Sequence, residues 1–273
     1  MIGRRLVNGV ESSAISVDDR GLQYGDGLFE TMAAVDGRVR HFERHMERLA
    51  EGGRRLGLPV PDPAVIAAEC ERALTGLGAG SVKLMVTRGP GPRSYRPPAD
   101  PSVTRIVVSS APKHRNDPGD GIVVRLCDTP LGLNPRLAGL KHLNRLEQVL
   151  ASAEWNDPAI AEGLMSSVDG RIICATAANV FLVRDGDLVT PAIRDCGVAG
   201  VMRGLVLAAA RELAVTTDIT DVSLEDLQRA DEVFLTNAIT GVRPVGEILG
   251  LRRYAAPGDV TRALLDWTAR AAE

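Results

Sequence analysis

Hydrophobic and polar positions alternate in short runs along the first third of the chain, a pattern that predicts β-strands. The run GLFETMAAV is followed by DGRVRHF, and the Asp36-Gly37 pair between them predicts a hairpin turn. From Phe42 to Leu56 the apolar residues change to helical spacing, and the run PAVIAAECERALTGL predicts a second helix after the break LPVPDP. Two more strands, SVKLMVTRG and TRIVVSSAP, are expected on either side of the loop GPGPRSYRPPADPS.

The pattern after this region indicates a second domain. The segment APKHRNDPGDG is rich in proline and glycine, which favours an interdomain linker with its boundary near Asn116. We therefore expect a smaller N-terminal α+β domain at residues 1–116 and a larger C-terminal α+β domain at residues 117–273.

Short strands and helices also alternate in the expected C-terminal domain. It begins with the strand GIVVRLCD and a helix at HLNRLEQVLASAEW, and continues with a meander of strands that turn at Asp169-Gly170 and Asp185-Gly186. The run GVAGVMRGLVLAAARELA predicts a long helix, and Ser223 and Asp226 predict the capped start of a short helix before the strand DEVFLTNAI. Because regular βαβαβ alternation is missing, the pattern does not favour a doubly wound dinucleotide fold.

Composition narrows the function classes. The 273 residues include 32 Lys and Arg against 35 Asp and Glu, so the net charge of −3 provides no basic field for nucleic acid. No run approaches the roughly 18 apolar residues of a membrane span, and no apolar segment follows the first arginines as in a signal peptide, so we expect a cytoplasmic protein. The four cysteines show no CxxC spacing, so we expect no metal site and interpret them as small buried residues.

Amine chemistry has few candidate residues. The chain has only three lysines, Lys83, Lys113 and Lys141. Lys141 lies between an apolar GL pair and a predicted helix start, where burial would lower the pKa of its ammonium toward that of a nucleophilic amine. Lys83 belongs to an alternating strand and Lys113 to the expected linker, so Lys141 is the lysine best placed to bind a carbonyl cofactor.

Two glycine-containing turns could bind a phosphate. In GVAGVMRG the backbone N–H groups of Val201 and Met202 come at the predicted helix start, where the helix dipole favours an anion. The alternative is that Gly197 and Gly200 simply make a tight turn. The segment TNAITGVRPV offers a second turn of this kind after a strand, and Arg48 could add a bidentate cation or be an ordinary surface residue.

The loop RGPGPRSYRPP carries three arginines around one tyrosine. Arg88, Arg93 and Arg96 with Tyr95 could present a cationic, hydrogen-bonding edge to a substrate carboxylate. The alternative is a proline-stiffened loop that faces only solvent.

Seven motifs taken together resemble one family. They are DRGLQYGDGLFET, HFERHMERL, TRGPGPRSY, LGLNPRLAGLKHLNRLEQVLA, ATAANVFLV, TPAIRDCGVAGVMRG and ADEVFLTNAITGVRPV. Their order and separations resemble the fold-type IV pyridoxal-phosphate (PLP) enzymes, which include D-amino-acid and branched-chain aminotransferases and 4-amino-4-deoxychorismate lyases. The resemblance implies a two-lobed α+β fold like that of D-amino-acid aminotransferase, with PLP in the cleft between the domains, and a homodimer. The fourth motif and the RGxGxRxY loop are most similar to those of the lyases, which make 4-aminobenzoate and pyruvate for folate synthesis.

The resemblance also implies roles for individual residues. Lys141 matches the lysine that binds PLP covalently and moves a proton, and Arg48 matches the arginine that binds its phosphate. Arg93 and Tyr95 match loop residues that contact the substrate carboxylate across a subunit boundary, and Phe29 is expected to contact substrate with them. The implied cofactor-binding residues are Arg48, Lys141, Cys174, Val201, Met202, Ala238 and Ile239.

Cys174 departs from the family pattern. Five residues before Asn179 the family has a glutamate that hydrogen-bonds the pyridine nitrogen, and a thiol is a poor substitute. The cofactor would withdraw electrons less strongly, which argues against transamination more than against a lyase reaction that forms an aromatic ring. We therefore expect an aminodeoxychorismate lyase, with a D-amino-acid or branched-chain aminotransferase as one alternative and a PLP-binding protein without catalysis as another.

Overall fold

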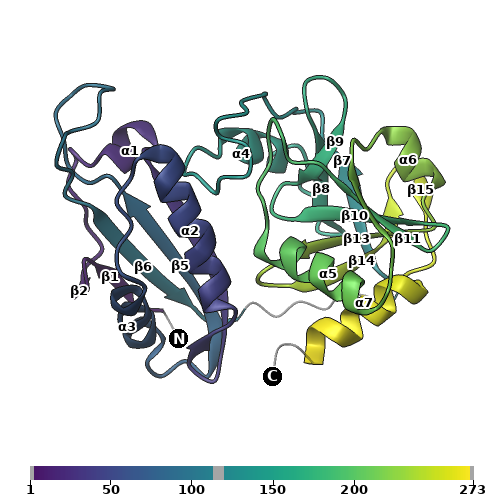
Figure 1. Ribbon diagram of the computed structural model, residues 1–273, viewed down its shortest axis with the longest axis horizontal. Helices are drawn as coiled ribbons and strands as arrows, with labels where there is room; N and C mark the ends of the chain where they lie inside the picture. The colour runs from purple at the N-terminus through teal and green to yellow at the C-terminus, as the bar shows by residue number, and fades with distance from the viewer. Residues whose placement is uncertain (1–2, 113–119, 271–273) are drawn as a thin grey trace. The chain divides into compact units, whose positions relative to one another are not determined.

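The chain forms two compact units in the computed structural model, which describes residues 3–112 and 120–270 (Figure 1). Unit 1 comprises Met1–His114 and Leu140–Asn144, and unit 2 comprises Arg115–Gly139 and Arg145–Glu273. The predicted boundary near Asn116 lies outside the described residues. The short segment Leu140–Asn144, which we expected in the C-terminal domain, therefore belongs with unit 1.

Unit 1 is an antiparallel sheet with three helices. The sheet has the strand order β2-β1-β6-β5-β3-β4. The elements are β1 (Arg5–Val7), β2 (Val10–Glu11), α1 (Arg20–Tyr24), β3 (Gly27–Val35), β4 (Arg38–Val39), α2 (Phe42–Leu56), α3 (Pro63–Leu74), β5 (Ala79–Thr87) and β6 (Thr104–Ser110). Helix α2 packs on β3 and α3 on β6. Alternate residues of β3, such as Leu28 and Met32, enter the core against Leu49 of α2.

Unit 2 is built on a mixed sheet with the order β12-β11-β10-β13-β14-β7-β8-β9, and β15 pairs with β14. Its strands are β7 (Ile122–Leu126), β8 (Ile160–Ser166), β9 (Ile172–Ala175), β10 (Asn179–Arg184), β11 (Asp187–Pro191), β12 (Thr217–Thr220), β13 (Glu232–Asn237), β14 (Gly241–Ile248) and β15 (Arg252–Arg253). Its helices are α4 (Leu146–Ser152), α5 (Val201–Glu212), α6 (Leu224–Arg229) and α7 (Asp259–Arg270).

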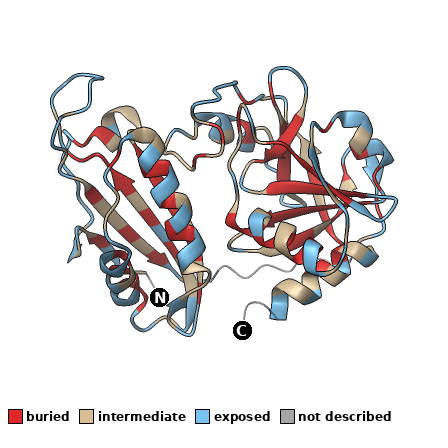
Figure 2. Ribbon diagram, viewed as in Figure 1, coloured by how far each residue is buried: buried red, intermediate tan, exposed pale blue. Residues whose placement is uncertain are grey.

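The two largest apolar clusters of unit 2 lie around its sheet, and the buried strands stand out in Figure 2. One cluster lies among the strands and includes Val124, Leu235 and Val245. The other cluster contains the stacked rings of Phe181 and Phe234, whose centroids are 5.0 Å apart, together with residues of α5 and α7. Transferring this much apolar surface from water is the main force that stabilises such a fold.

Several predicted elements are confirmed. Helix α2 spans Phe42–Leu56, and the hairpin turns at Asp36 and Gly37, whose φ angles of 50° and 73° suit a tight two-residue turn. Ser223 and Asp226 form a reciprocal capping box at the start of α6. The α+β class is thus confirmed.

One predicted helix begins later than its sequence pattern indicates. We expected it to start at HLNRLEQ, but α4 begins at Leu146. Residues before it extend the edge of β3 instead: Phe29 N–H donates to Lys141 O at 2.9 Å, and Leu143 N–H donates to Gly27 O at 3.0 Å. Backbone groups that pair with a strand in this way cannot also form a helical turn.

Candidate functional site

Lys141 is held against β3 by backbone and side chain together. Its carbonyl accepts the hydrogen bond from Phe29 N–H, and its Nζ lies 4.2 Å from the centroid of the Phe29 ring. A cation over an aromatic face is attracted by the ring quadrupole, which limits the positions that the amine samples. The structure therefore brings together two of the predicted site residues, Lys141 and Phe29, although they are 112 positions apart in the sequence.

A second amine lies near the same ring. Lys83 Nζ is 5.2 Å from the Phe29 centroid, but Lys83 is exposed on β5. The third lysine, Lys113, lies outside the described residues. Lys83 is thus a natural internal control for Lys141.

Arg48 is fixed by a buried carboxylate. Its Nε donates to Glu30 Oε1 at 2.9 Å, and its Nη2 pairs with Glu30 Oε2. His45 Nδ1 lies 2.6 Å from the same Oε2, and the Glu30 and His45 side chains are almost fully buried. Burial alone would raise the pKa of Glu30, but hydrogen bonds and charge from His45 and Arg48 outweigh it and hold the pKa below its ordinary value. This geometry fixes the guanidinium of Arg48 in one orientation.

The start of helix α5 has the features expected of an anion site. Gly200, its N-cap residue, provides no side-chain hydrogen bond to the first turn. A Cβ on Gly200 would lie 2.0 Å from Asn179 Oδ1, so only glycine fits, and Asn179 Nδ2 donates to Val198 O at 2.9 Å. The side chains of Val201 and Met202 are buried, so these residues can offer an anion only backbone groups.

The two predicted phosphate turns lie together. Ala238, in the turn after β13, packs against the cluster of Val201, Met202 and Leu205. The N–H of Ile239, however, donates to Asn237 Oδ1 at 2.9 Å, so Ile239 would have to share its amide with that side chain to bind a phosphate.

A buried hydroxyl without a hydrogen-bond partner in the structure lies at the end of β13. Thr236 is 1% exposed, its Oγ1 makes no hydrogen bond to the described residues, and it is the register partner of Asn179. A buried polar atom without a partner is costly, and a bound ligand can supply one. Thr236 was not among the predicted site residues.

Cys174 presents a neutral thiol. It is buried on β9 opposite Met165, in a cluster with Leu131 and Cys196. Burial raises the pKa of Cys174 to about 12, and the nearby Cys196 adds to this effect, so the group carries no charge at pH 7. Unlike a carboxylate, this thiol brings no negative charge to its position on β9.

The arginine loop exposes its predicted substrate-binding side chains. Arg93 is exposed, and Tyr95 is 86% exposed. Arg88 differs from them: it is 4% exposed and donates to Asp26 Oδ2 at 2.8 Å, so it has a structural position rather than the substrate-facing one that the motif suggested.

Glu30 shows what sequence reasoning missed and which signal could have found it. Alternate residues of β3 face the core, and Glu30 occupies one of those positions between Leu28 and Met32. A carboxylate at a core position of a strand is rare unless it has a partner. That pattern could have indicated a buried ion pair, although not its partners on α2.

The described residues contain neither a cluster of metal ligands nor a membrane-spanning helix. Residues 3–112 and 120–270 contain no group of three His, Cys, Asp or Glu side chains placed to hold a metal ion. Within the same ranges no helix has the length and apolar character required to span a membrane.

Comparisons with known proteins agree with the resemblance. The family model for amino-transferase class IV matches residues 27–248. The aminodeoxychorismate lyase of Vibrio harveyi is 36% identical over 244 residues, which cover 89% of this chain and 90% of that protein. A putative branched-chain-amino-acid aminotransferase of Methanocaldococcus jannaschii is 30% identical over 262 residues, which cover 93% of this chain and 90% of the relative.

Solved structures show the same fold. The 4-amino-4-deoxychorismate lyase of Pseudomonas aeruginosa superposes with a TM-score of 0.92 at 46% identity, over 97% of this chain and 98% of that chain. The branched-chain aminotransferase of Escherichia coli gives a TM-score of 0.87 at 23% identity, over 100% and 95% of the two chains, and shows the fold alone. The prediction of a fold-type IV protein is confirmed, and the chain belongs to the amino-transferase class IV family.

Proposed function

We propose that this chain is a PLP-dependent aminodeoxychorismate lyase, which converts 4-amino-4-deoxychorismate to 4-aminobenzoate and pyruvate. The observation that carries the proposal is the placement of Lys141. Its backbone is hydrogen-bonded to β3, and its Nζ lies over the Phe29 ring. The likeness to lyases from Vibrio harveyi and Pseudomonas aeruginosa, at 36% and 46% identity over nearly the whole chain, favours this reaction over others of the family.

The described residues fit PLP. The uncapped start of α5 and the buried hydroxyl of Thr236 suit a phosphate, and Gly200 leaves room beside Asn179 that a Cβ would fill. Arg48 adds a fixed cation that is bonded to Glu30. When bound, PLP supplies an electron-withdrawing ring that stabilises negative charge next to the substrate nitrogen.

Lys141 has two tasks in the proposed reaction. Lys141 would hold PLP through its Nζ, and the same Nζ would remove the proton from the substrate ring carbon that carries the amine. The C–O bond to the enolpyruvyl group breaks, the ring becomes aromatic, and the released enol takes up a proton to become pyruvate. The atoms of the substrate equal those of the two products, so no water or second substrate is needed.

Cys174 favours the lyase over an aminotransferase. We propose that its thiol occupies the place of the carboxylate that would accept a hydrogen bond from the protonated pyridine nitrogen. With a pKa of about 12 the thiol stays neutral, and the weakened electron withdrawal slows transamination. Loss of the enolpyruvyl group is driven partly by the aromatic product, so it tolerates this change better.

The exposed loop supplies recognition in this proposal. Arg93 and Tyr95 present a guanidinium and a phenol to the carboxylates of the substrate. Phe29, whose ring lies beside Lys141, would contact the substrate ring.

We also propose a homodimer. Leu146, Val149 and Leu150 form one face of α4 at helical spacing, and their exposures of 76%, 60% and 60% leave an apolar surface in the single chain. Sedimentation equilibrium should give twice the monomer mass, and Leu150→Glu should shift it toward the monomer. A wild-type protein that stays monomeric at micromolar concentration would contradict the dimer.

The cytoplasmic location expected from the sequence stays a prediction.

The first test of the function is a spectrum and a product assay on the purified chain. We expect an absorption band near 400 nm that borohydride removes, and equal amounts of 4-aminobenzoate and pyruvate after addition of 4-amino-4-deoxychorismate. Keto-acid-dependent amino transfer without 4-aminobenzoate would instead support the aminotransferase alternative, which the relative from Methanocaldococcus jannaschii favours. A band without any turnover would indicate a PLP-binding protein, and no band after addition of PLP would refute the proposal.

A further inference from the structure

A buried arginine holds the backbone of the loop that carries Arg93 and Tyr95. Arg20, on α1, is 2% exposed, and its guanidinium donates to the carbonyl oxygens of Ser94 at 2.5 Å and Tyr95 at 3.1 Å. Its Nε donates to Asp26 Oδ2 at 2.9 Å. A single charged group thus fixes two neighbouring peptide units of an otherwise exposed loop, and charge-assisted hydrogen bonds of this kind are stronger than neutral ones.

One aromatic ring, that of Tyr24, covers this anchor. The Tyr24 ring centroid lies 4.9 Å from the guanidinium carbon of Arg20 and 5.4 Å from the centroid of the Tyr95 ring. A Cβ on Gly91 would lie 3.1 Å from Cδ of Arg20, so the loop backbone passes close to the arginine stem. These contacts keep water away from the hydrogen bonds that hold the loop.

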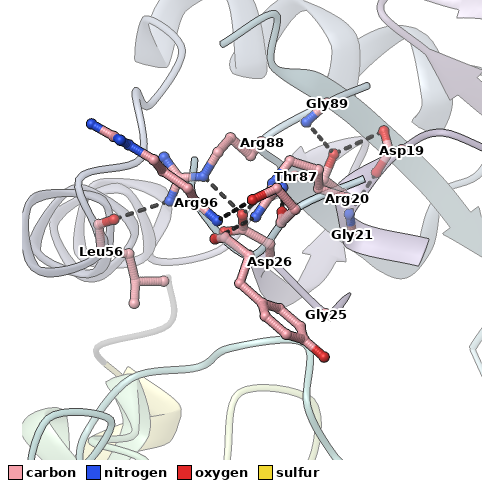
Figure 3. A network of polar contacts seen from close by, with 12 residues as sticks. Asp19, Arg20, Gly21, Gly25, Asp26, Leu56, Thr87, Arg88, Gly89 and Arg96 are labelled. Carbon is pink, nitrogen blue, oxygen red and sulfur yellow. Dashed lines mark hydrogen bonds and ion pairs between the residues drawn. The ribbon is translucent and has the colours of Figure 1, made fainter. Parts of the chain in front are cut away.

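The carboxylate of Asp26 serves a second arginine with a different task. Arg88 donates to Asp26 Oδ2 and to the carbonyl oxygens of Leu56 and Gly57 at the end of α2, as Figure 3 shows in part. Burial alone would raise the pKa of Asp26, but Arg88 and Arg20 hold it below its ordinary value. Both arginines therefore share one half-buried carboxylate, and of the two Arg20 is the one that donates to the loop.

We propose that Arg20 is a positioning residue for recognition of the substrate carboxylates, because it fixes the loop from which Arg93 and Tyr95 extend. The inference rests on the proposed function of that loop. An anchored backbone lets the two side chains bind without first ordering the loop, which lowers the entropy lost on binding. Loss of the anchor should weaken substrate binding and leave the chemistry at Lys141 unchanged.

Arg20→Lys and Arg20→Met test this inference with two readouts. The first is the KM for 4-amino-4-deoxychorismate, which should rise about tenfold while kcat stays within about threefold. The second needs no activity: trypsin should cut the Arg93–Ser94 bond of the folded holoenzyme about tenfold faster, measured by mass spectrometry of the two fragments. PLP occupancy, read from the absorption band, should not change.

Two controls separate the anchor from general destabilisation. Arg88→Lys disturbs the same carboxylate and should lower thermal stability without faster cleavage at Arg93. Arg54→Met removes an arginine that is exposed and pairs only with Glu51 at the surface, so it should alter neither readout. If the Arg20 variants do not fold, Tyr24→Leu tests the same point, because it keeps the charge of Arg20 and removes the ring that covers it. This variant should also raise the KM and speed cleavage at Arg93.

The outcomes are distinct. Faster cleavage together with a raised KM supports the inference. Unchanged cleavage, or faster cleavage with an unchanged KM, overturns it while the lyase function stands. A wild-type chain that forms no 4-aminobenzoate refutes the proposed function, and that measurement is made before any variant is interpreted.

Discussion

The two units place their proposed functional groups by different means. In unit 1 carboxylates fix arginine side chains: the buried Glu30 bonds Arg48, and the half-buried Asp26 bonds Arg20 and Arg88. In unit 2 the buried carboxylate of Glu232 instead accepts from the backbone N–H groups of Val260 and Thr261 at the start of α7. Charges in unit 1 orient guanidinium groups, whereas that charge in unit 2 completes a helix start.

The difference teaches where an anion can be bound by rigid groups. A guanidinium orients well only if another charge or hydrogen bond holds it, because its stem has many rotamers. A helix start needs no such partner, since its backbone is already fixed by the fold. Arg48 therefore depends on Glu30, and the start of α5 depends only on the small Gly200. The following predictions test this comparison.

Lys141→Ala should have the largest effect. Removal of the proposed nucleophile and base should lower lyase turnover by about 10³-fold or more and abolish borohydride-stable attachment of PLP. Lys83→Ala is the matched control, because Lys83 Nζ lies near the same Phe29 ring but is exposed, and its turnover should stay within about threefold of the wild type. Equal losses for the two variants in the product assay would contradict the assignment of Lys141.

Glu30→Gln should be the most damaging change to the charged network of unit 1. It leaves the buried His45 and the half-buried Arg48 with a neutral partner, so the free energy of unfolding should fall by about 3 kcal/mol, and PLP should bind more weakly. Urea unfolding and titration with PLP measure the two effects. Glu51→Gln, in an exposed pair with Arg54, should change neither, and the comparison fails if Glu51→Gln is equally harmful.

Acid should weaken unit 1 through two carboxylates that arginines hold, Glu30 and Asp26. The pKa values of Glu30 and Asp26 lie below their ordinary 4.5 and 3.8, so in this range the unfolded chain binds protons that the folded chain does not. Their stabilising contribution is complete above the ordinary values and is lost as the pH falls toward the folded ones, at up to about 1.4 kcal/mol per pH unit for each group. Urea unfolding between pH 6 and pH 3 should show this slope, and Glu30→Gln should reduce it. An identical slope in the variant would show that Glu30 does not contribute.

Cys174→Glu should sharpen the role of unit 2 with a smaller effect. A carboxylate at this position should raise keto-acid-dependent amino transfer about tenfold relative to the lyase rate. Cys127→Glu introduces the same charge beside the same apolar cluster and serves as the control. A similar gain in the control, assayed with the same amino donors, would exclude a specific role for residue 174.

Local patterns predicted much of the fold. Helical spacing gave the bounds of α2, and an Asp-Gly pair gave the hairpin between β3 and β4, because both depend on neighbouring residues. The predicted start of α4 was wrong because Lys141 and Leu143 pair with β3. That strand lies more than 110 positions earlier in the chain. No local pattern contains such a partner.

The candidate site shows the same limit. Glycine turns and a scarce lysine, which local sequence displays, indicated Val201, Met202 and Lys141, whereas Phe29 and Cys174 were named only through the family resemblance. Arg20 was missed because its partners include Ser94 and Tyr95, 74 and 75 positions away, and Thr236 because an unsatisfied hydroxyl is visible only in three dimensions. Which charges and hydroxyls become buried is decided by packing between distant segments.

The pairing of Leu140–Asn144 with β3 also determines how the gene could be divided. Unit 1 is completed by five residues that are encoded after the first strand of unit 2, so no single cut in the chain yields an intact unit 1. A fragment that ends near residue 112 would lack Lys141 and would leave the N–H of Phe29 at an open strand edge. A functional hybrid with a relative would therefore have to exchange Leu140–Asn144 together with the N-terminal part.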